Sequence, residues 1–366
     1  MPPVSETPSD PVRLSVCSRS IVSLAYILLL LIGILGNTLV IRVLRGLRGR
    51  RSVQASLSQH MCSLASCDLL QLVVGIPIEL YSSIWCPFPW PLGATGCSGF
   101  YYMWEVLCYA AIFNVLSLSC ERHQATCQPL SLHLRQASGV RLRICLLWLA
   151  SFLAGLPMLF SMGLENIYAE VTEQQPELLA CTPLGQRRGF FTASVWASFF
   201  TYIGVLLIVG VTCWKMRRAL EESHTLEVLG PDGSVQFLDR FCNGQIMTAR
   251  RQNARMLGCI VGALAVCWLP FQARRLMTIM RSKEQWTETY YRSYITLQPI
   301  TNSFYYLSSC LTPLLYNLTS RTFRRAFLQT LIPCLQRPLL ASGSWQQQSS
   351  IQGGRLSHQG QETSNL

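Results

Sequence analysis

A few charged side chains interrupt the long apolar stretches of this sequence, and these residues could do chemistry there. A charge within lipid is costly, so such residues usually face the interior of a helix bundle, pair with one another or mark a functional site. The candidates are Asp68, Glu105, Glu121, Arg122, Arg274 and Arg275. We expect a binding or switching function from this set, because no nucleophile stands beside a base in it.

Glu105 could pair with one or both of the adjacent residues Arg274 and Arg275, because a buried charge is costly unless it is paired. Two interpretations of this group carry nearly equal weight. Either the charges contact a ligand, or they form a structural ion pair that closes a pocket.

Three further charges lie elsewhere in the apolar stretches or at their ends. Glu121 and Arg122 are neighbours near the predicted inner end of a helix, where the arginine could pair with the acid or extend to the membrane surface. Asp68 stands alone. It is either protonated and hydrogen-bonded, or it binds a cation.

Patterns typical of enzymes and of metal sites are absent from the sequence. Neither HExxH nor GxSxG occurs, so we predict that the chain is not an enzyme and needs no cofactor. Zinc prefers histidine, cysteine and carboxylate ligands. The five histidines all fall on the predicted inner side or at inner helix ends: His60, His123, His133, His224 and His358. We therefore name no metal ligands.

Composition shows which elements must position these residues. Half of the 366 residues are hydrophobic and only 13% are charged, whereas a soluble domain carries about 25% charge. A membrane-spanning helix needs roughly 20 mostly apolar residues. Seven stretches qualify: 21–44, 57–81, 98–122, 143–162, 190–214, 256–280 and 294–317. The predicted fold is an all-α membrane protein with a seven-transmembrane helix bundle.

Charge asymmetry between the loops sets the expected orientation. Basic residues cluster in alternate loops and the acids in the other set, so the net charge of +12 indicates membrane orientation rather than a nucleic-acid partner. The positive-inside rule then places the N-terminus outside and the C-terminus in the cytoplasm. We expect a multi-pass protein of the plasma membrane whose surroundings are the lipid bilayer.

The chain divides into four expected parts. Residues 1–20 form a polar extracellular N-terminus, and residues 21–318 form the seven-transmembrane domain. Residues 319–332 alternate basic and apolar side chains, which is typical of an amphipathic surface helix. Residues 333–366 are rich in Ser, Gln and Gly and are predicted to be a disordered cytoplasmic tail.

Other membrane-protein classes fit this pattern poorly. A transporter is often built from paired inverted repeats with broken helices, and no such pairing is visible here. A channel needs a filter or a ring of pore-lining residues, and none is recognisable. The remaining alternative is a receptor fold that acts as a scavenger or decoy with little signalling.

Characteristic residues occur in a fixed order along the apolar stretches. In chain order they are Gly36-Asn37, Leu64-Ala65 with Asp68, Cys97, Glu121-Arg122-His123, Pro129-Leu130, Trp148, Cys267-Trp268-Leu269-Pro270 and Pro313-Leu314-Leu315-Tyr316. Each alone is weak, but the ordered set resembles the rhodopsin-like family of G-protein-coupled receptors over roughly residues 20–332.

This resemblance implies roles for the candidate residues. Arg122 would be released on activation to meet a heterotrimeric G protein, and Pro270 would be the hinge that swings the sixth helix outward. Trp268 would pack below the ligand. The other residues that it assigns to coupling and activation are Glu121, Leu130, Pro313 and Tyr316. Without the resemblance, Arg122 is an ordinary interface anchor and Pro270 a static kink. Arrestin is a second implied partner.

The cysteines carry three further expectations. The resemblance implies a disulfide bond between Cys97 and Cys181. Cys17 and Cys86 are the other cysteines of the predicted outer face, and four cysteines allow three connectivities. A bond between Cys17 and Cys86 is the secondary expectation. Cys334 follows the expected surface helix, where palmitoylation is the expected modification.

Finer matches resemble the ghrelin, motilin and neurotensin receptor group, and within it the zinc-responsive orphan receptor. They lie at residues 79–85, 248–252, 264–268 and 304–309. In that group, an acid facing arginines across the pocket, as Glu105 would face Arg274 and Arg275, helps to hold peptide or peptide-like ligands. Zinc and peptides are thus the candidate ligands, and the resemblance implies a G protein of the Gq class.

Some positions depart from the family pattern. Thr312 replaces the usual asparagine before Pro313, and Ala111 stands where many relatives carry a hydroxyl. Both changes remove ligands from the family's sodium pocket around Asp68, so we expect weak or absent sodium modulation. Arg250 stands where some receptors place an acid that locks Arg122, so we expect measurable ligand-independent signalling.

Overall fold

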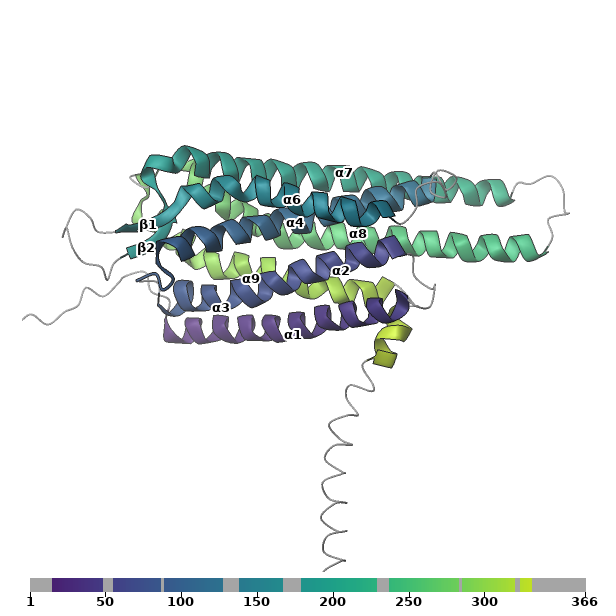
Figure 1. The fold of residues 1–366 in the computed structure, drawn as a ribbon, viewed down its shortest axis with the longest axis horizontal. Helices are drawn as coiled ribbons and strands as arrows, with labels where there is room; N and C mark the ends of the chain where they lie inside the picture. Colours follow the sequence, from purple (N-terminus) through teal and green to yellow (C-terminus); the bar gives the residue numbers. More distant parts are fainter. Residues whose placement is uncertain are drawn as a thin grey trace, which may run out of the picture.

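A computed structural model describes residues 15–48, 55–86, 89–127, 138–166, 179–228, 237–282, 285–319 and 323–330. The chain forms a bundle of long helices (Figure 1). The long helices are α1 (Val16–Arg48), α4 (Gly93–Cys127), α6 (Ser138–Ser161), α7 (Arg188–Val228), α8 (Phe237–Met280) and α9 (Glu288–Thr319). The second predicted stretch forms a segmented helix, described next, so all seven predicted helices are confirmed.

The second helix changes its winding three times. It runs through α2 (Ala55–Leu70), the π-helical turn η1 (Gln71–Gly75), α3 (Ile76–Glu79) and a second π-helical segment η2 (Leu80–Trp85). Pro77 lies in the first turn of α3, directly after the π turn η1, and without an N–H it cannot donate a hydrogen bond to the preceding turn. A π turn adds residues to a helical turn and so changes which side chains face the neighbouring helices.

Helix α4 lies at the centre of the bundle. It contacts α2, α6, α7 and α8, while α1 and α9 pack against each other and close the ring. The close approach of α1 to α9 requires a glycine: a Cβ at Gly36 would lie 2.9 Å from Cγ of Pro313. Asn37 adds a hydrogen bond from Nδ2 to the Ser309 carbonyl, 3.0 Å long.

The surface of the bundle is apolar, as lipid requires. Large exposed hydrophobic residues follow one face of the outer helices, such as Leu31 and Leu35 on α1, Leu149 and Leu153 on α6 and Leu207 on α7. Among the residues that the structure describes, six helical segments are long and apolar enough to cross a membrane. Helix α9 is long enough but carries more polar residues, several of which, including Asn302 and Ser309, are buried in the interior.

One end of the bundle, here called the strand end, carries a hairpin that the sequence analysis did not predict. Strands β1 (Met162–Asn166) and β2 (Leu179–Pro183) pair antiparallel, with Leu164 opposite Cys181. Cys181 is bonded to Cys97 at the start of α4, so the first predicted disulfide is confirmed. Ser98 Oγ also donates to the Met162 carbonyl at 2.7 Å.

The secondary expectation, a bond between Cys17 and Cys86, is not met, because both thiols are free. In place of a disulfide, the residue before Cys86 contacts helix α1 at positions that follow Cys17 in the sequence. Trp85 Nε1 donates to Ser23 Oγ at 2.9 Å, and the Arg19 guanidinium lies 5.3 Å from the Trp85 ring centre.

The chain ends differ in detail from the expected boundaries. Helix α1 begins at Val16, inside the segment predicted to be a polar N-terminus. At the opposite end of the bundle, a short helix spans 323–330 within the predicted surface helix 319–332. Its first side chain, Phe323, is buried against the ring of Tyr316. Leu130, Cys334 and the tail 333–366 lie outside the described residues.

Candidate functional site

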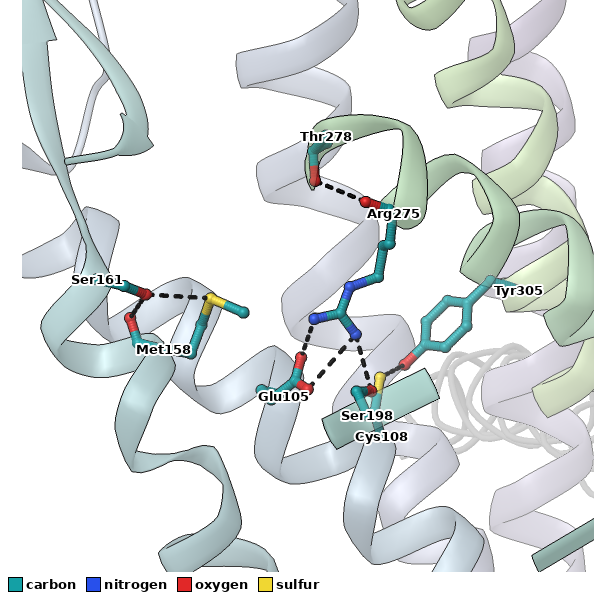
Figure 2. A network of polar contacts seen from close by, with 8 residues as sticks. All are labelled: Glu105, Cys108, Met158, Ser161, Ser198, Arg275, Thr278 and Tyr305. Carbon is teal, nitrogen blue, oxygen red and sulfur yellow. Dashed lines mark hydrogen bonds and ion pairs between the residues drawn. The ribbon is translucent and has the colours of Figure 1, made fainter. Parts of the chain in front are cut away.

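The predicted ion pair lies inside the strand-end half of the bundle. Arg275 on α8 contacts Glu105 on α4 with both terminal nitrogens, at 2.7 Å (Nη2 to Oε2) and 3.4 Å (Nη1 to Oε1). Nη1 also donates to Ser198 Oγ on α7 at 3.0 Å (Figure 2). Only 1% of Glu105 and 9% of Arg275 is exposed. The pair therefore ties three helices together in a site shielded from water.

Arg274 points away from that pair, toward α9. Its guanidinium donates to Thr301 Oγ1 at 3.0 Å, Tyr294 OH at 2.9 Å and Asn302 Oδ1 at 3.1 Å. Neighbouring residues of a helix are about 100° apart around its axis, which explains why the two arginines reach different helices. Unlike Arg275, Arg274 has only neutral acceptors among these partners.

Below the arginines lies an aromatic layer around Trp268. Its ring packs against Tyr202 and Tyr305, at centroid distances of 6.2 and 5.4 Å. Trp268 Nε1 donates to Ser308 Oγ at 2.9 Å. Pro270 lies inside α8, between Trp268 and the two arginines in the sequence. A ligand that moves this layer would therefore act on α8 beside its proline.

A buried carboxylate that the sequence analysis did not select lies beside this site. Glu79, 4% exposed, accepts hydrogen bonds from Tyr26 OH at 2.8 Å, Asn302 Nδ2 at 2.6 Å and Tyr306 OH at 2.9 Å. The available signal was an acid within the predicted stretch 57–81. Only its contacts with α1 and α9 distinguish it from an ordinary charge near the end of a span.

Asp68 lines a cavity beneath the aromatic layer. The wall of this cavity includes Asp68, Ala111, Trp268, Ser308 and Thr312. Oδ2 of Asp68 has no hydrogen-bond partner among the described residues. The two positions that depart from the family pattern, Ala111 and Thr312, therefore do share one cavity with the carboxylate.

The second group of candidates lies toward the opposite end. Arg122 Nη2 contacts Glu121 Oε1 at 2.8 Å, and only 2% of Arg122 is exposed. His60 on α2 lies on the other side of this acid, with Nε2 3.4 Å from Glu121 Oε2. Glu121 thus has two basic neighbours, of which the histidine was not predicted.

The two candidates on α9 also lie toward this end. Pro313 packs against α1 near Gly36. Tyr316 is fully buried, and its hydroxyl has no hydrogen-bond partner among the described residues. Within the described part of the chain, no group of three His, Cys, Asp or Glu side chains could hold a metal ion.

Comparison with known proteins finds one family and several relatives, all of which are receptors by name. The family described as "7 transmembrane receptor (rhodopsin family)" matches residues 36–316. The chain is 37% identical to mouse G-protein coupled receptor 39 over 328 residues, which cover 84% of this chain and 71% of that protein. It is 35% identical to human neurotensin receptor type 1 over 329 residues, covering 87% of this chain and 78% of that protein.

Proposed function

This chain belongs to the rhodopsin family of seven-transmembrane, G-protein-coupled receptors, and from this premise we propose that it binds an extracellular peptide-like ligand at its strand end. The observation that supports the ligand class is the pair of buried arginines. Arg275 is neutralised by Glu105, whereas Arg274 is held by Thr301, Tyr294 and Asn302. An anionic group on a peptide would find its partner at Arg274.

The orientation that this proposal needs has physical support. The Cys97–Cys181 bond lies at the strand end, and disulfides persist in oxidising, extracellular surroundings. Exposed arginines gather at the opposite end, such as Arg42, Arg45, Arg141 and Arg143, as expected for a cytoplasmic face. The proposed location is the plasma membrane, with the N-terminus outside.

The proposed mechanism is a population shift. The ligand binds more tightly to the state in which α8 has swung outward at Pro270, and so enriches that state. Trp268 transmits ligand contact to the hinge, and Arg122 leaves Glu121 to meet the G protein. Leu130, Pro313 and Tyr316 belong to the same coupling surface by family pattern. We propose the Gq class as first partner, arrestin as a later one and palmitoylation at Cys334.

Zinc is the weaker ligand proposal, because the predicted outer face has no histidine. The peptide proposal starts from the relatives, one group of which is named for neurotensin. Both candidates can be tested in one experiment. Inositol phosphate accumulation is measured in cells expressing the wild type, Arg122→Ala or Arg274→Gln at matched surface levels, across titrations of zinc chloride and of neurotensin.

A peptide-evoked rise that Arg274→Gln weakens at least tenfold in potency, and that Arg122→Ala abolishes, is the expected result. A zinc-evoked rise that depends on Arg122 but not on Arg274 would replace the peptide proposal by a metal ligand. If neither compound acts and basal signal does not depend on Arg122, the chain is a scavenger or decoy rather than a signalling receptor.

A further inference from the structure

The buried carboxylate of Glu79 lies where three parts of the bundle meet. Tyr26 reaches it from α1, and Asn302 and Tyr306 reach it from α9, while Glu79 itself ends α3. The rings of Tyr26 and Tyr306 also pack edge to face, 5.6 Å apart. A buried carboxylate requires this number of donors, because it has lost its hydration.

None of these donors is charged, so the compensating cation must act from further away. Asn302 connects Glu79 to one. Its Nδ2 donates to Glu79 Oε1 at 2.6 Å, and its Oδ1 accepts from Arg274 Nη2 at 3.1 Å. The amide orientation follows from these partners, because the flipped amide would place its oxygen against a carboxylate and its NH₂ against a guanidinium. Both bonds are charge-assisted, and each polarises the other.

The consequence of this chain of contacts is the direction in which Arg274 points. Its other partners, Thr301 and Tyr294, lie on α9 as well. Arg275, the next residue, turns to Glu105 and Ser198 on α4 and α7. The two guanidinium groups therefore point in different directions, each toward its own carboxylate. Arg275 contacts Glu105 directly, whereas Arg274 is linked to Glu79 through the amide of Asn302.

We propose that Glu79 is a positioning residue of the ligand site: it acts through Asn302 to hold the Arg274 guanidinium against α9. Tyr26 and Tyr306 also donate hydrogen bonds to this carboxylate, and Tyr26 thereby connects it to α1. The relevance of Glu79 to ligand binding rests on the proposed function of Arg274. The effect of Glu79 on the position of Arg274 is independent of that proposed function and can be measured without a ligand.

The experiment uses phenylglyoxal, which reacts with accessible guanidinium groups. The full-length receptor is purified in lipid nanodiscs as wild type and as Glu79→Gln. The rate of modification is then followed at Arg274 and at Arg275 by peptide mass spectrometry. Arg275 is the internal control, because its partners do not include Asn302. Glu288→Gln is the matched control variant, because Glu288 is exposed and pairs with Arg292.

We expect Glu79→Gln to raise the modification rate of Arg274 at least threefold and to leave that of Arg275 unchanged. Equal acceleration at both arginines would mean general loosening of the bundle, and no change at Arg274 would mean that Thr301 and Tyr294 suffice. Either result overturns the proposal.

An exchange variant keeps the test valid if Glu79→Gln alone folds poorly. Glu79→Gln combined with Asn302→Asp moves the carboxylate next to Arg274 and lets the new amide donate to it. We expect the slow, wild-type modification rate of Arg274 to return. A rate that stays high in the double variant would contradict the proposal. Failure of peptide binding with protection of Arg274 intact would count against the proposed function alone.

Discussion

Glu105 and Arg275 lie 170 residues apart in the sequence and meet through both oxygens and both terminal nitrogens, at 2.7 and 3.4 Å. This two-point contact joins α4 to α8, the helix that carries Pro270. Because both side chains are buried, either charge without the other would be left in a medium that solvates it poorly. The pair therefore contributes to the packing of α8 as well as to the proposed ligand site.

The first prediction concerns this pair. Breaking a buried ion pair by removing one partner costs about 3–5 kcal/mol, so Glu105→Gln and Arg275→Gln should each lower the melting temperature of the purified receptor. The combined variant should recover part of the loss, because no unpaired charge remains. Tryptophan fluorescence during heating measures all three variants. Additive losses in the combined variant would contradict this account.

The second prediction concerns the opposite end. Glu121→Gln should raise ligand-independent signalling severalfold above wild type, because it removes the charge that holds Arg122 at 2.8 Å. The wild type itself should signal above mock-transfected cells, since Arg250 stands where some receptors carry an acidic lock for Arg122. Inositol phosphate accumulation at matched surface expression checks both.

His60→Gln provides a graded comparison. It removes the second basic neighbour of Glu121, which lies 3.4 Å away, and should change the basal signal less than Glu121→Gln does. Arg122→Ala should abolish the signal. A basal level in Glu121→Gln no higher than that of the wild type would refute this role for the acid.

Sequence reasoning was sufficient for the helices but not for their ends or windings. Apolar length identifies each span, because lipid enforces it. Helices α7 and α8 continue to Val228 and back to Phe237, respectively, beyond the apolar stretches, because the requirement for apolar residues ends with the hydrocarbon core. The π turns of the second helix leave no pattern of their own, and the hairpin β1–β2 depends on packing against α4.

The candidate site likewise contains residues that the sequence predicted and residues that it did not. Glu105 and Arg275 were predictable as partners, because opposite charges in neighbouring spans need each other. The sequence did not predict which of the two arginines pairs with Glu105, because this depends on the rotation of α8 about its axis by a single residue. Glu79 and His60 are buried by tertiary contacts from α1, α9 and α4, and no local pattern contains that information.

The third prediction concerns the hydrogen bond below the proposed ligand site. Trp268 Nε1 donates to Ser308 Oγ at 2.9 Å, and a buried donor left without its acceptor costs about 1–3 kcal/mol. Ser308→Ala should therefore destabilise the resting position of Trp268 and raise basal signalling. Ser308→Thr, which keeps the hydroxyl, is the matched control. Equal basal signals in the two variants would show that the hydrogen bond does not bias the switch.

The fourth prediction is that sodium does not stabilise this receptor. A hard cation takes several oxygen ligands, and the cavity that contains Asp68 presents Ala111 and Thr312 where many relatives offer a hydroxyl and an amide. An ion that binds only the folded state raises the melting temperature by mass action. The wild type should thus melt at the same temperature in sodium chloride and in choline chloride.

A gain-of-binding variant makes this prediction sharper. Ala111→Ser combined with Thr312→Asn returns two ligands to the wall of the cavity, and its melting temperature should rise with sodium but not with choline. Adding Asp68→Asn should remove that rise, because the carboxylate supplies the charge that attracts the cation. A wild type that already melts higher in sodium than in choline would contradict the prediction. Asp68 and the remaining oxygens, such as those of Ser308 and Thr312, would then suffice as ligands. The two departures from the family pattern would in that case leave cation binding intact.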